Sequence, residues 1–259
     1  FYPLGLATIR GRLDMVRLLL NHGADVSLRR PKWHTALLTA CLGGHASILE
    51  ELITAGADPN ERYTKGRTPL LWLAREGSAR IVKTLINAGA QLDARDFDGC
   101  AAIHHAAAVG HTSTLHELVV AGSSHAWRSN NFQTPLAVAC FSGKWENVKH
   151  LLDNCGADPG VIDGLRHTPL QIAAHHGHLA VVKLLLRCDV HELGPNAYPG
   201  ALCAAAMAGN VSVLGALLVA EGRAHANGTE IGTKMTPLLY SAGNCHPIPT
   251  AMLLEAGGD

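Results

Sequence analysis

Short apolar blocks recur along the chain, and each is closed by glycine before a polar stretch begins. The pairs Leu19-Leu20, Leu52-Ile53 and Leu85-Ile86 are each followed, three residues later, by Gly-Ala. An apolar block that ends at glycine is typical of a short helix, because glycine adopts the positive φ of a helix C-cap at little cost. The pattern therefore predicts short helices that end at regular intervals.

A second marker, Thr-Pro-Leu, indicates where helices begin. It occurs four times, starting at Thr68, Thr134, Thr168 and Thr236, and weaker copies fill the gaps. Threonine before proline suits a helix N-cap, because proline at the first helical position has no N–H to leave unpaired. The third residues of the eight copies are Leu4, Leu37, Leu70, Ile103, Leu136, Leu170, Leu202 and Leu238. Their spacing is 33 residues over the first four intervals and then 34, 32 and 36.

A glycine turn lies between the two markers, as at Gly44-His45, Gly110-His111 and Gly177-His178. We expect the histidines of these turns to bind nearby backbone. Each period thus predicts a first helix, a turn, a second helix, a Gly-Ala cap and a polar segment that forms a tight hairpin. The array is predicted to be one domain over residues 1–259, with repeats at approximately 1–29, 30–62, 63–95, 96–128, 129–162, 163–194, 195–230 and 231–259.

A 33-residue period with Thr-Pro-Leu-His-x-Ala is the signature of the ankyrin repeat, and this chain resembles that family over nearly its whole length. His104 keeps the histidine of the signature. The resemblance implies an all-α solenoid of helix-turn-helix units with short hairpin fingers. It further implies a protein–protein interaction scaffold or adaptor, which binds a partner on its concave face and finger tips.

The repeats are not uniform. The first begins at its first helix, so we expect the chain to start inside a longer protein. In the sixth repeat, residues 188–190 read Cys-Asp-Val where Gly-Ala is expected, and residues 193–199 carry two prolines. The eighth has Pro247 and Pro249 at the start of its second helix, where a first turn tolerates proline. We therefore expect a change of curvature near residues 188–200 and a less regular C-terminal end.

Composition narrows the class of partner. Lysine plus arginine equals aspartate plus glutamate, at 21 each, so the formal net charge is zero. Nucleic-acid binding by phosphate neutralisation needs a basic surface, so that partner is not expected. No apolar run reaches the roughly 18 to 20 residues of a membrane span, so no membrane insertion is expected. Seven scattered cysteines favour free thiols in a reducing compartment, and we expect an intracellular, cytoplasmic protein.

Motifs for catalysis and metal binding are missing from the sequence. It contains no phosphate-binding loop, no Gly-x-Ser-x-Gly turn, no His-Glu-x-x-His helix and no Cys-x-x-Cys. Histidine pairs occur at His104-His105 and His175-His176, but adjacent helical residues point about 100° apart and cannot chelate one metal. Packing or solvation explains the local pair Cys188 and His191 better than a metal does. An open solenoid offers a groove, so we expect no enzyme, no metal, no cofactor and no small-molecule ligand.

In the ankyrin family, partner-binding residues come from finger tips and from the exposed face of the first helix. In the fingers of this chain, these positions hold Trp33, His34, Lys65, Arg67, Phe97, Asn130 and Phe132. On the first helices they hold Trp72, Arg75, Glu76, His105, Phe141, His175, His176, Met207 and Tyr240. Interface anchors are enriched in Trp, Tyr and Arg, so we predict that this set binds the partner. Alternatively, each aromatic side chain packs on a neighbouring repeat and is partly buried.

Two other functions stay open. One is a structural spacer in a larger assembly, since an incomplete first repeat would leave Leu4, Leu6 and Ile9 near an uncapped end. The other is a regulatory or substrate-recruiting domain of a larger enzyme, such as a ubiquitin-ligase receptor. Family analogy alone supports this last function.

Overall fold

The computed structural model describes residues 2–28, 34–194, 196–220, 225–230 and 233–259. These residues form helices joined by turns, and no strand occurs among them, so the predicted all-α fold is confirmed. Most helices form pairs in chain order, and each pair consists of a first and a second helix. The first four pairs are α1 (Pro3–Ile9) with α2 (Leu13–Asn21), α3 (Ala36–Leu42) with α4 (Ala46–Thr54), α5 (Pro69–Glu76) with α6 (Ala79–Asn87), and α7 (Ala102–Val109) with α8 (Thr112–Val120). The next four are α9 (Pro135–Phe141) with α10 (Trp145–Cys155), α11 (Pro169–His175) with α12 (Leu179–Leu185), α14 (Ala197–Ala208) with α15 (Val211–Ala220), and α16 (Pro237–Gly243) with α17 (Pro247–Glu255). A short helix, α13 (Val190–Leu193), and a 3₁₀ turn, η1 (Thr64–Gly66), lie between pairs.

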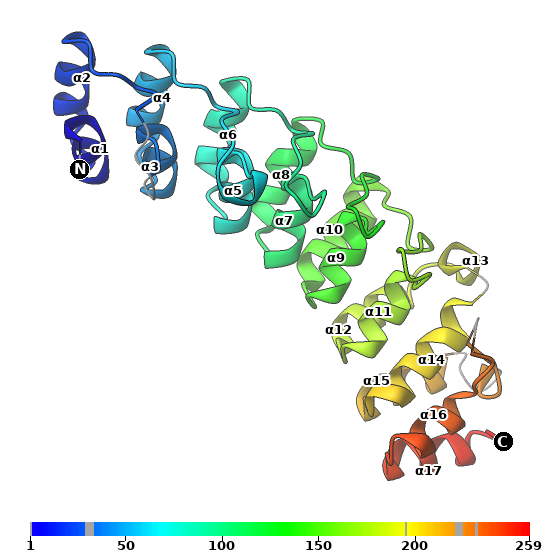
Figure 1. The fold of residues 1–259 in the computed structure, drawn as a ribbon. Coiled ribbons are helices and arrows are strands. Elements are labelled where there is room, and N and C mark those ends of the chain that lie inside the picture. The colour runs from blue at the N-terminus through cyan, green and yellow to red at the C-terminus, as the bar shows by residue number, and fades with distance from the viewer. Residues whose placement is uncertain (1, 29–33, 195, 221–224, 231–232) are drawn as a thin grey trace. The chain divides into compact units, whose positions relative to one another are not determined.

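The chain divides into two compact units. Unit 1 comprises residues 1–106 and 111–124, and unit 2 comprises residues 107–110 and 125–259. Within each unit, each helix pair lies beside the next pair along the chain (Figure 1). The buried side chains are mostly Leu, Ala, Val and Ile, and they are spread over every pair. Each unit therefore has a layered core, as expected for a repeat protein.

Threonine starts the first helix in five repeats. A side-chain oxygen accepts a hydrogen bond from the backbone N–H three residues on, at 3.3–3.4 Å, in Thr35, Thr68, Thr134, Thr168 and Thr236. Such a cap stabilises a helix by about 1 kcal/mol relative to alanine. The N-caps predicted from Thr-Pro-Leu are thus confirmed.

The fourth repeat has Ala101 in the position of the threonine, and the first turn of the helix is closed by a histidine that bonds back to Ala101. His104 Nδ1 accepts a hydrogen bond from the Ala101 N–H at 3.2 Å, and the His104 side chain is buried. An accepting Nδ1 requires a neutral ring with its proton on Nε2. The signature histidine is therefore a structural residue in this chain.

Glycine follows the second helices where Gly-Ala predicts it. Gly23, Gly56, Gly89 and Gly156 have φ between 65° and 93°, a region that other residues rarely adopt. These positive angles end each helix and turn the chain towards the next finger.

The turn histidine His178 binds backbone, as expected, but the backbone belongs to the preceding repeat. Its Nε2 lies 2.9 Å from the carbonyl oxygen of Phe141, 37 residues earlier. Asn210 takes the same position one repeat later, and its Nδ2 donates to the carbonyl oxygens of Ala174 and His175 at 2.9 and 2.8 Å. These side chains tie the end of one first helix to the next helix pair.

The junction between the sixth and seventh repeats is irregular, as its prolines and missing glycine predict. α13 lies so close to the turn at Gly160 that a Cβ there would be 2.3 Å from the carbonyl oxygen of Glu192. α14 has 12 residues, whereas the other first helices have seven or eight. α14 begins three residues before Gly200, the position of the threonine cap in other repeats. Among its described residues, this repeat has no hairpin finger.

The layered core predicts a sharp contrast between two neighbours on α15. Leu217 is fully buried, whereas Val219 exposes 86% of its side chain. Leu217→Ala should lower the free energy of unfolding by about 2–5 kcal/mol, because it leaves a cavity between helices. Val219→Ala should change it by less than about 0.5 kcal/mol. Urea denaturation followed by circular dichroism measures both, and equal midpoints would contradict this packing.

Candidate partner-binding surfaces

In the described part of the chain, four hairpin fingers of five residues are closed by a backbone hydrogen bond from their first residue to their last. We number them by repeat: finger 3 (residues 63–67), finger 4 (96–100), finger 5 (129–133) and finger 6 (163–167). The N···O distances of the closures are 2.8, 3.1, 3.0 and 3.0 Å in that order. Four residues predicted to bind at finger tips are exposed: Lys65, Phe97, Asn130 and Phe132. Trp33 lies outside the described residues.

Two predicted residues of unit 1 turn towards a buried carboxylate. Asp96 Oδ2 lies 2.8 Å from His105 Nε2 and 3.6 Å from Arg67 Nε. Asp96 Oδ1 accepts hydrogen bonds from the N–H groups of Asp98 and Cys100, at 3.1 and 2.9 Å. The Asp96 carboxylate therefore holds finger 3, finger 4 and α7 together, and gives Arg67 and His105 a structural role.

The same environment sets the charge of His105. Burial is the largest cause of its pKa shift and lowers the pKa. The Asp96 carboxylate raises it, and the positive charges of Arg67 and Arg75 lower it further. Because the net shift is downward from an ordinary value of about 6.5, His105 is neutral at pH 7.

Trp72 is half-buried within an aromatic cluster of unit 1. The His34 ring meets Trp72 edge-on, with centroids 6.1 Å apart, and meets Tyr63 at the same distance. The Arg67 guanidinium carbon lies 5.6 Å from the Trp72 ring centroid, within cation–π range. Trp72 Nε1 is buried without a hydrogen-bond partner among the described residues. Two further predicted residues, Arg75 and Glu76, are exposed at the end of α5.

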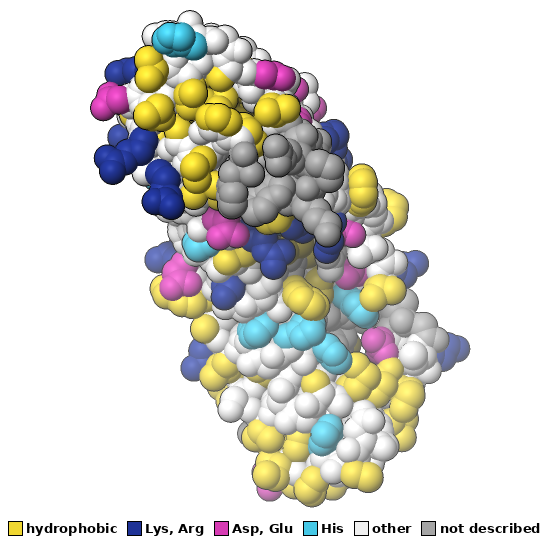
Figure 2. Space-filling model, turned by 60° about the vertical axis from the view of Figure 1, so that its left-hand side comes forward, with side chains coloured by type: hydrophobic (Ala, Val, Ile, Leu, Met, Phe, Trp, Pro, Cys, Tyr) yellow, Lys and Arg dark blue, Asp and Glu magenta, His cyan; other side chains and the backbone are white. Residues whose placement is uncertain are grey.

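Four predicted residues come together in unit 2. Phe141, at the end of α9, exposes 51% of its side chain, and its ring centroid lies 4.4 Å from that of His176. The His176 ring lies 5.0 Å from the His175 ring and 6.0 Å from the His178 ring. Met207 of α14 lines the same cavity as Phe141, His175 and His176. We call Phe141, His175, His176 and Met207 the histidine surface. Figure 2 shows histidine side chains gathered beside hydrophobic ones on one face of the molecule.

A cavity of about 330 Å³ opens beside the histidine surface and extends to finger 6. Its lining includes residues that were not predicted, namely Gln133, Asp163, Leu165, His167, Gln171 and Glu230. Leu165 gave a usable signal in the sequence, because a large apolar side chain stands there in a polar finger. It exposes 75% of its surface. The other five are polar residues of ordinary type, and their position depends on packing between repeats.

The central ring of the histidine surface, His176, is uncharged at neutral pH. Burial is the largest cause that lowers the pKa of His176, and the neighbouring His175 and His178 lower it further. Its pKa therefore lies below the ordinary value of about 6.5, and the ring is neutral at pH 7. A neutral imidazole beside an exposed phenyl ring offers an apolar contact with hydrogen-bonding edges.

Tyr240, predicted on the first helix of the eighth repeat, is bound to the polar segment that precedes this helix. Its hydroxyl donates a short hydrogen bond to Glu230 Oε2, which also accepts one from Thr233 Oγ1 at 3.1 Å. Burial, followed by the Glu230 hydrogen bond, raises the pKa of Tyr240. This network holds Glu230 at the rim of the cavity.

Further features of the described residues bear on metal sites, reactive thiols and membrane-spanning helices. They contain no group of three His, Cys, Asp or Glu side chains arranged to hold a metal ion. All seven cysteines are free thiols, and burial raises the pKa of Cys41 and Cys203 to about 12. None of the helices in the described part of the chain is long and apolar enough to cross a membrane.

A family model described as ankyrin repeats matches the chain in three copies, over residues 1–63, 37–125 and 103–196. Together the matches cover residues 1–196 of 259. The chain belongs to the ankyrin-repeat family. Ankyrin repeats are protein-interaction modules, and the helical solenoid implied by the sequence pattern is thereby confirmed.

Two curated proteins match parts of this ankyrin array. A probable E3 ubiquitin-protein ligase, XBOS33 of Oryza sativa subsp. japonica, is 51% identical over 43 residues. That match covers 17% of this chain and 8% of the ligase. The target of rapamycin complex 2 subunit AVO2 of Saccharomyces cerevisiae is 32% identical over 93 residues, or 35% of this chain and 21% of AVO2. The chain thus spans less than a quarter of the length of either relative.

The charges around His105 in the ankyrin array make opposite predictions for two variants. Asp96→Asn removes the carboxylate that favours the charged ring, so the pKa of His105 should fall. Arg75→Gln removes a repelling positive charge, so the pKa should rise. NMR titration of the His105 imidazole measures both shifts. Shifts of the same sign in the two variants would contradict the assigned network.

Proposed function

We propose that this ankyrin-repeat protein binds a partner protein through the histidine surface and the adjoining fingers 5 and 6. One observation carries the proposal: Phe141 leaves half of its side chain exposed while its ring contacts His176 beside a cavity of about 330 Å³. Aromatic residues make up only 5% of the chain, so an exposed one beside an open cavity is an uncommon feature here. An apolar partner side chain in the cavity would remove both Phe141 and Met207 from water.

The exposed residues of unit 1 support further contacts in the same proposal. Lys65 and Phe97 lie at finger tips, and Arg75 and Glu76 lie at the end of a first helix. These are the positions that partners of ankyrin repeats contact in the family. Charged side chains at an interface rim favour rapid association and correct register more than affinity.

A second proposal is that the array recruits a partner or substrate to a larger protein. The observation that favours it is the 51% identity, over 43 residues, to a probable E3 ubiquitin-protein ligase. In that arrangement these repeats would bind and another segment would catalyse. Seven free thiols would suit a reducing, intracellular location for either proposal.

If the histidine surface binds the partner, a crosslinker placed on it should capture that partner. A photocrosslinking amino acid at His176 should capture a defined protein, whereas the same group at the exposed Val219 of α15 should not. The combined change Phe141→Ser and Met207→Ser should weaken binding of the captured protein by tenfold or more, because it removes the apolar anchors. Isothermal titration calorimetry with the purified partner measures the affinity.

A matched control comes from α17. Leu254 exposes 57% of its side chain, so Leu254→Ser removes a comparable apolar contact outside the proposed surface. It should leave the affinity unchanged, and both variants should keep the helical circular dichroism of the parent. Equal affinity for Phe141→Ser with Met207→Ser and for the parent would refute the proposal.

Binding at the histidine surface should weaken as the pH falls. A partner that covers His176 favours its neutral form, so protons compete with the partner once the pH drops below the lowered pKa of that ring. The loss should reach at most about tenfold per pH unit for each proton taken up. The other titratable groups that line the cavity or stack on the ring are His175, His178, His167, Asp163 and Glu230.

Affinity measured between pH 7.5 and 5.0 tests this dependence. His176→Gln cannot take up the proton and should flatten the profile, whereas His22→Gln, in unit 1, should leave it as in the parent. The same slope in the parent and in His176→Gln would contradict the role of this ring.

A further inference from the structure

Within each unit, two neighbouring fingers are linked by a backbone hydrogen bond in the same register. In unit 1, the N–H of Phe97, the second residue of finger 4, donates to the carbonyl of Lys65, the third residue of finger 3, at 3.0 Å. In unit 2, the N–H of Gly164, the second residue of finger 6, donates to the carbonyl of Asn131, the third residue of finger 5, at 2.9 Å. In both units, the N–H of the second residue of one finger donates to the carbonyl of the third residue of the finger before it. If this pattern continued, the carbonyl of Leu165, the third residue of finger 6, would accept a hydrogen bond from a seventh finger.

The seventh repeat supplies no such finger among its described residues. The chain leaves finger 6 for α11 and α12, passes through α13, and enters the extended α14 at Ala197. No described residue donates a hydrogen bond to the Leu165 carbonyl. Among the described residues, the next hairpin closes just before α16, where the Glu230 N–H donates to the Met235 carbonyl at 3.1 Å. We call the interval between these two hairpins the finger-7 gap.

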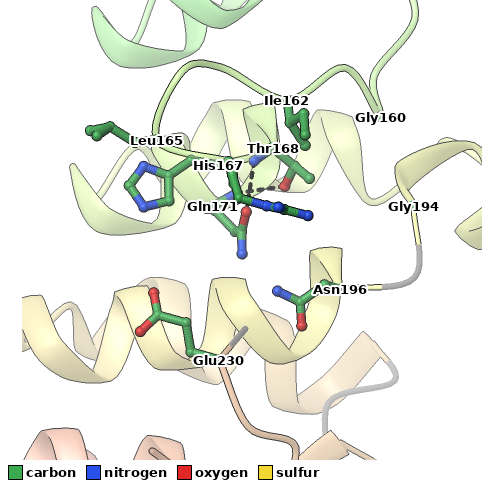
Figure 3. A pocket seen from close by; sticks show the side chains of 10 residues that line it. Gly160, Ile162, Leu165, His167, Thr168, Gln171, Gly194, Asn196 and Glu230 are labelled. Carbon is green, nitrogen blue, oxygen red and sulfur yellow. Dashed lines mark hydrogen bonds between the residues drawn. The ribbon is translucent and has the colours of Figure 1, made fainter. Parts of the chain in front are cut away.

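The finger-7 gap contains a cavity of about 250 Å³. Ile162, Leu165 and His167 line one side of it, and Asn196 and Glu230 line the other (Figure 3). The volume is that of a few residues rather than of a folded element. It can therefore accept the tip of a turn, the same kind of structure as the fingers on either side.

The side chain that would face an inserted turn follows from the register of the fingers. The second residue of one finger lies over the fourth residue of the finger before it. A Cβ at Gly66, the fourth residue of finger 3, would lie 2.8 Å from the Phe97 ring. A Cβ at Gly164 would lie 3.5 Å from the ring of Phe132, the fourth residue of finger 5. By the same register, the second residue of an inserted turn would lie over Arg166.

The charges that line the finger-7 gap indicate which side chain the second residue of an inserted turn should have. Arg166 is exposed, lines the cavity, and has no ion pair with any described residue. The carboxylate across the gap, Glu230, already accepts hydrogen bonds from the hydroxyls of Thr233 and Tyr240. Those hydroxyls are neutral, so they position the Glu230 carboxylate without cancelling its charge. Arg166 has no carboxylate partner among the described residues, so an acidic side chain placed directly over Arg166 complements that cation.

We propose that the finger-7 gap binds a tight, acidic turn of a partner protein and completes the row of fingers. The turn donates a backbone N–H to the Leu165 carbonyl, and the side chain of the same residue pairs with Arg166. This inference rests on the proposed protein-binding role but uses none of the four residues of the histidine surface. It specifies the recognised segment of the partner as a tight turn with an acidic side chain.

A backbone-cyclised peptide that copies finger 4 provides the probe. It carries residues 94–101 with Phe97→Glu and Cys100→Ser, so the sequence is Ala-Arg-Asp-Glu-Asp-Gly-Ser-Ala. Titration into the full ¹⁵N-labelled chain should shift the amide signals of Leu165, Arg166 and Asn196 in a saturable way. N-methylation of the peptide Glu removes the donated hydrogen, so it should weaken binding about tenfold or more.

Matched variants of the chain separate this site from the histidine surface. Arg166→Glu should weaken peptide binding about tenfold or more, whereas Arg187→Glu, at another exposed arginine of unit 2, should leave it within about twofold. Phe141→Ser with Met207→Ser should also leave it unchanged. If that double variant abolishes peptide binding, the peptide occupies the histidine surface and the finger-7 proposal is wrong.

Further results would overturn the proposal. One is the lack of any saturable shift at these amides up to about 1 mM peptide, or equal binding of the N-methylated peptide. Another is that the same amides shift with the concentration of the chain alone, in which case a second copy of this chain is the occupant. A captured partner that binds normally to Arg166→Glu but not to Phe141→Ser with Met207→Ser would overturn this inference and keep the proposed function.

Discussion

Consecutive first helices approach so closely that small side chains must fill the space between them, and the rest of each unit depends on this constraint. In unit 2, a Cβ at Gly200 of α14 would lie 1.6 Å from Gln171 Nε2 of α11. Ala173-Ala174 and Ala205-Ala206 on the same two helices are fully buried. Larger side chains such as Leu170 fill the remaining interior positions, whereas Phe141, the last residue of α9, exposes 51% of its side chain. Close stacking of the first helices therefore uses small side chains at the contact points and leaves an exposed aromatic ring at the end of α9.

Features whose cause lies within one period could be predicted from the sequence. Thr68 and Gly156 set helix ends through their own backbone and side chains, and the period placed them correctly. Contacts that cross repeats could not be predicted in this way. The tie between Arg67 and Asp96 joins residues of neighbouring repeats, and the carbonyl that His178 binds lies 37 residues away. No local pattern records those distances.

The same limit applies to the candidate site. Exposed positions follow from the family register, so the first-helix residues Phe141, His175 and His176 could be proposed from the sequence. The cavity beside them depends on how finger 6, α11 and α14 pack, and the signal for Leu165 was an apolar side chain in a polar segment. Glu230, which lines the same cavity, has an ordinary sequence context. Its position depends on a hydrogen bond from Tyr240, a residue ten positions away.

The irregular junction between the sixth and seventh repeats leaves a backbone acceptor that regular repeats do not leave. Within each unit, the later of two neighbouring fingers satisfies a backbone carbonyl of the earlier one, as Phe97 does for Lys65 and Gly164 does for Asn131. Where α14 extends by a turn in place of a finger, helical hydrogen bonds satisfy its backbone, and α13 covers the base of finger 6 at Gly160. The core is therefore kept, and what the loss of the finger exposes is an acceptor at Leu165. An exposed acceptor at the end of a hydrogen-bonded row costs little while water solvates it, and it gives a partner a directional contact that the regular repeats reserve for one another.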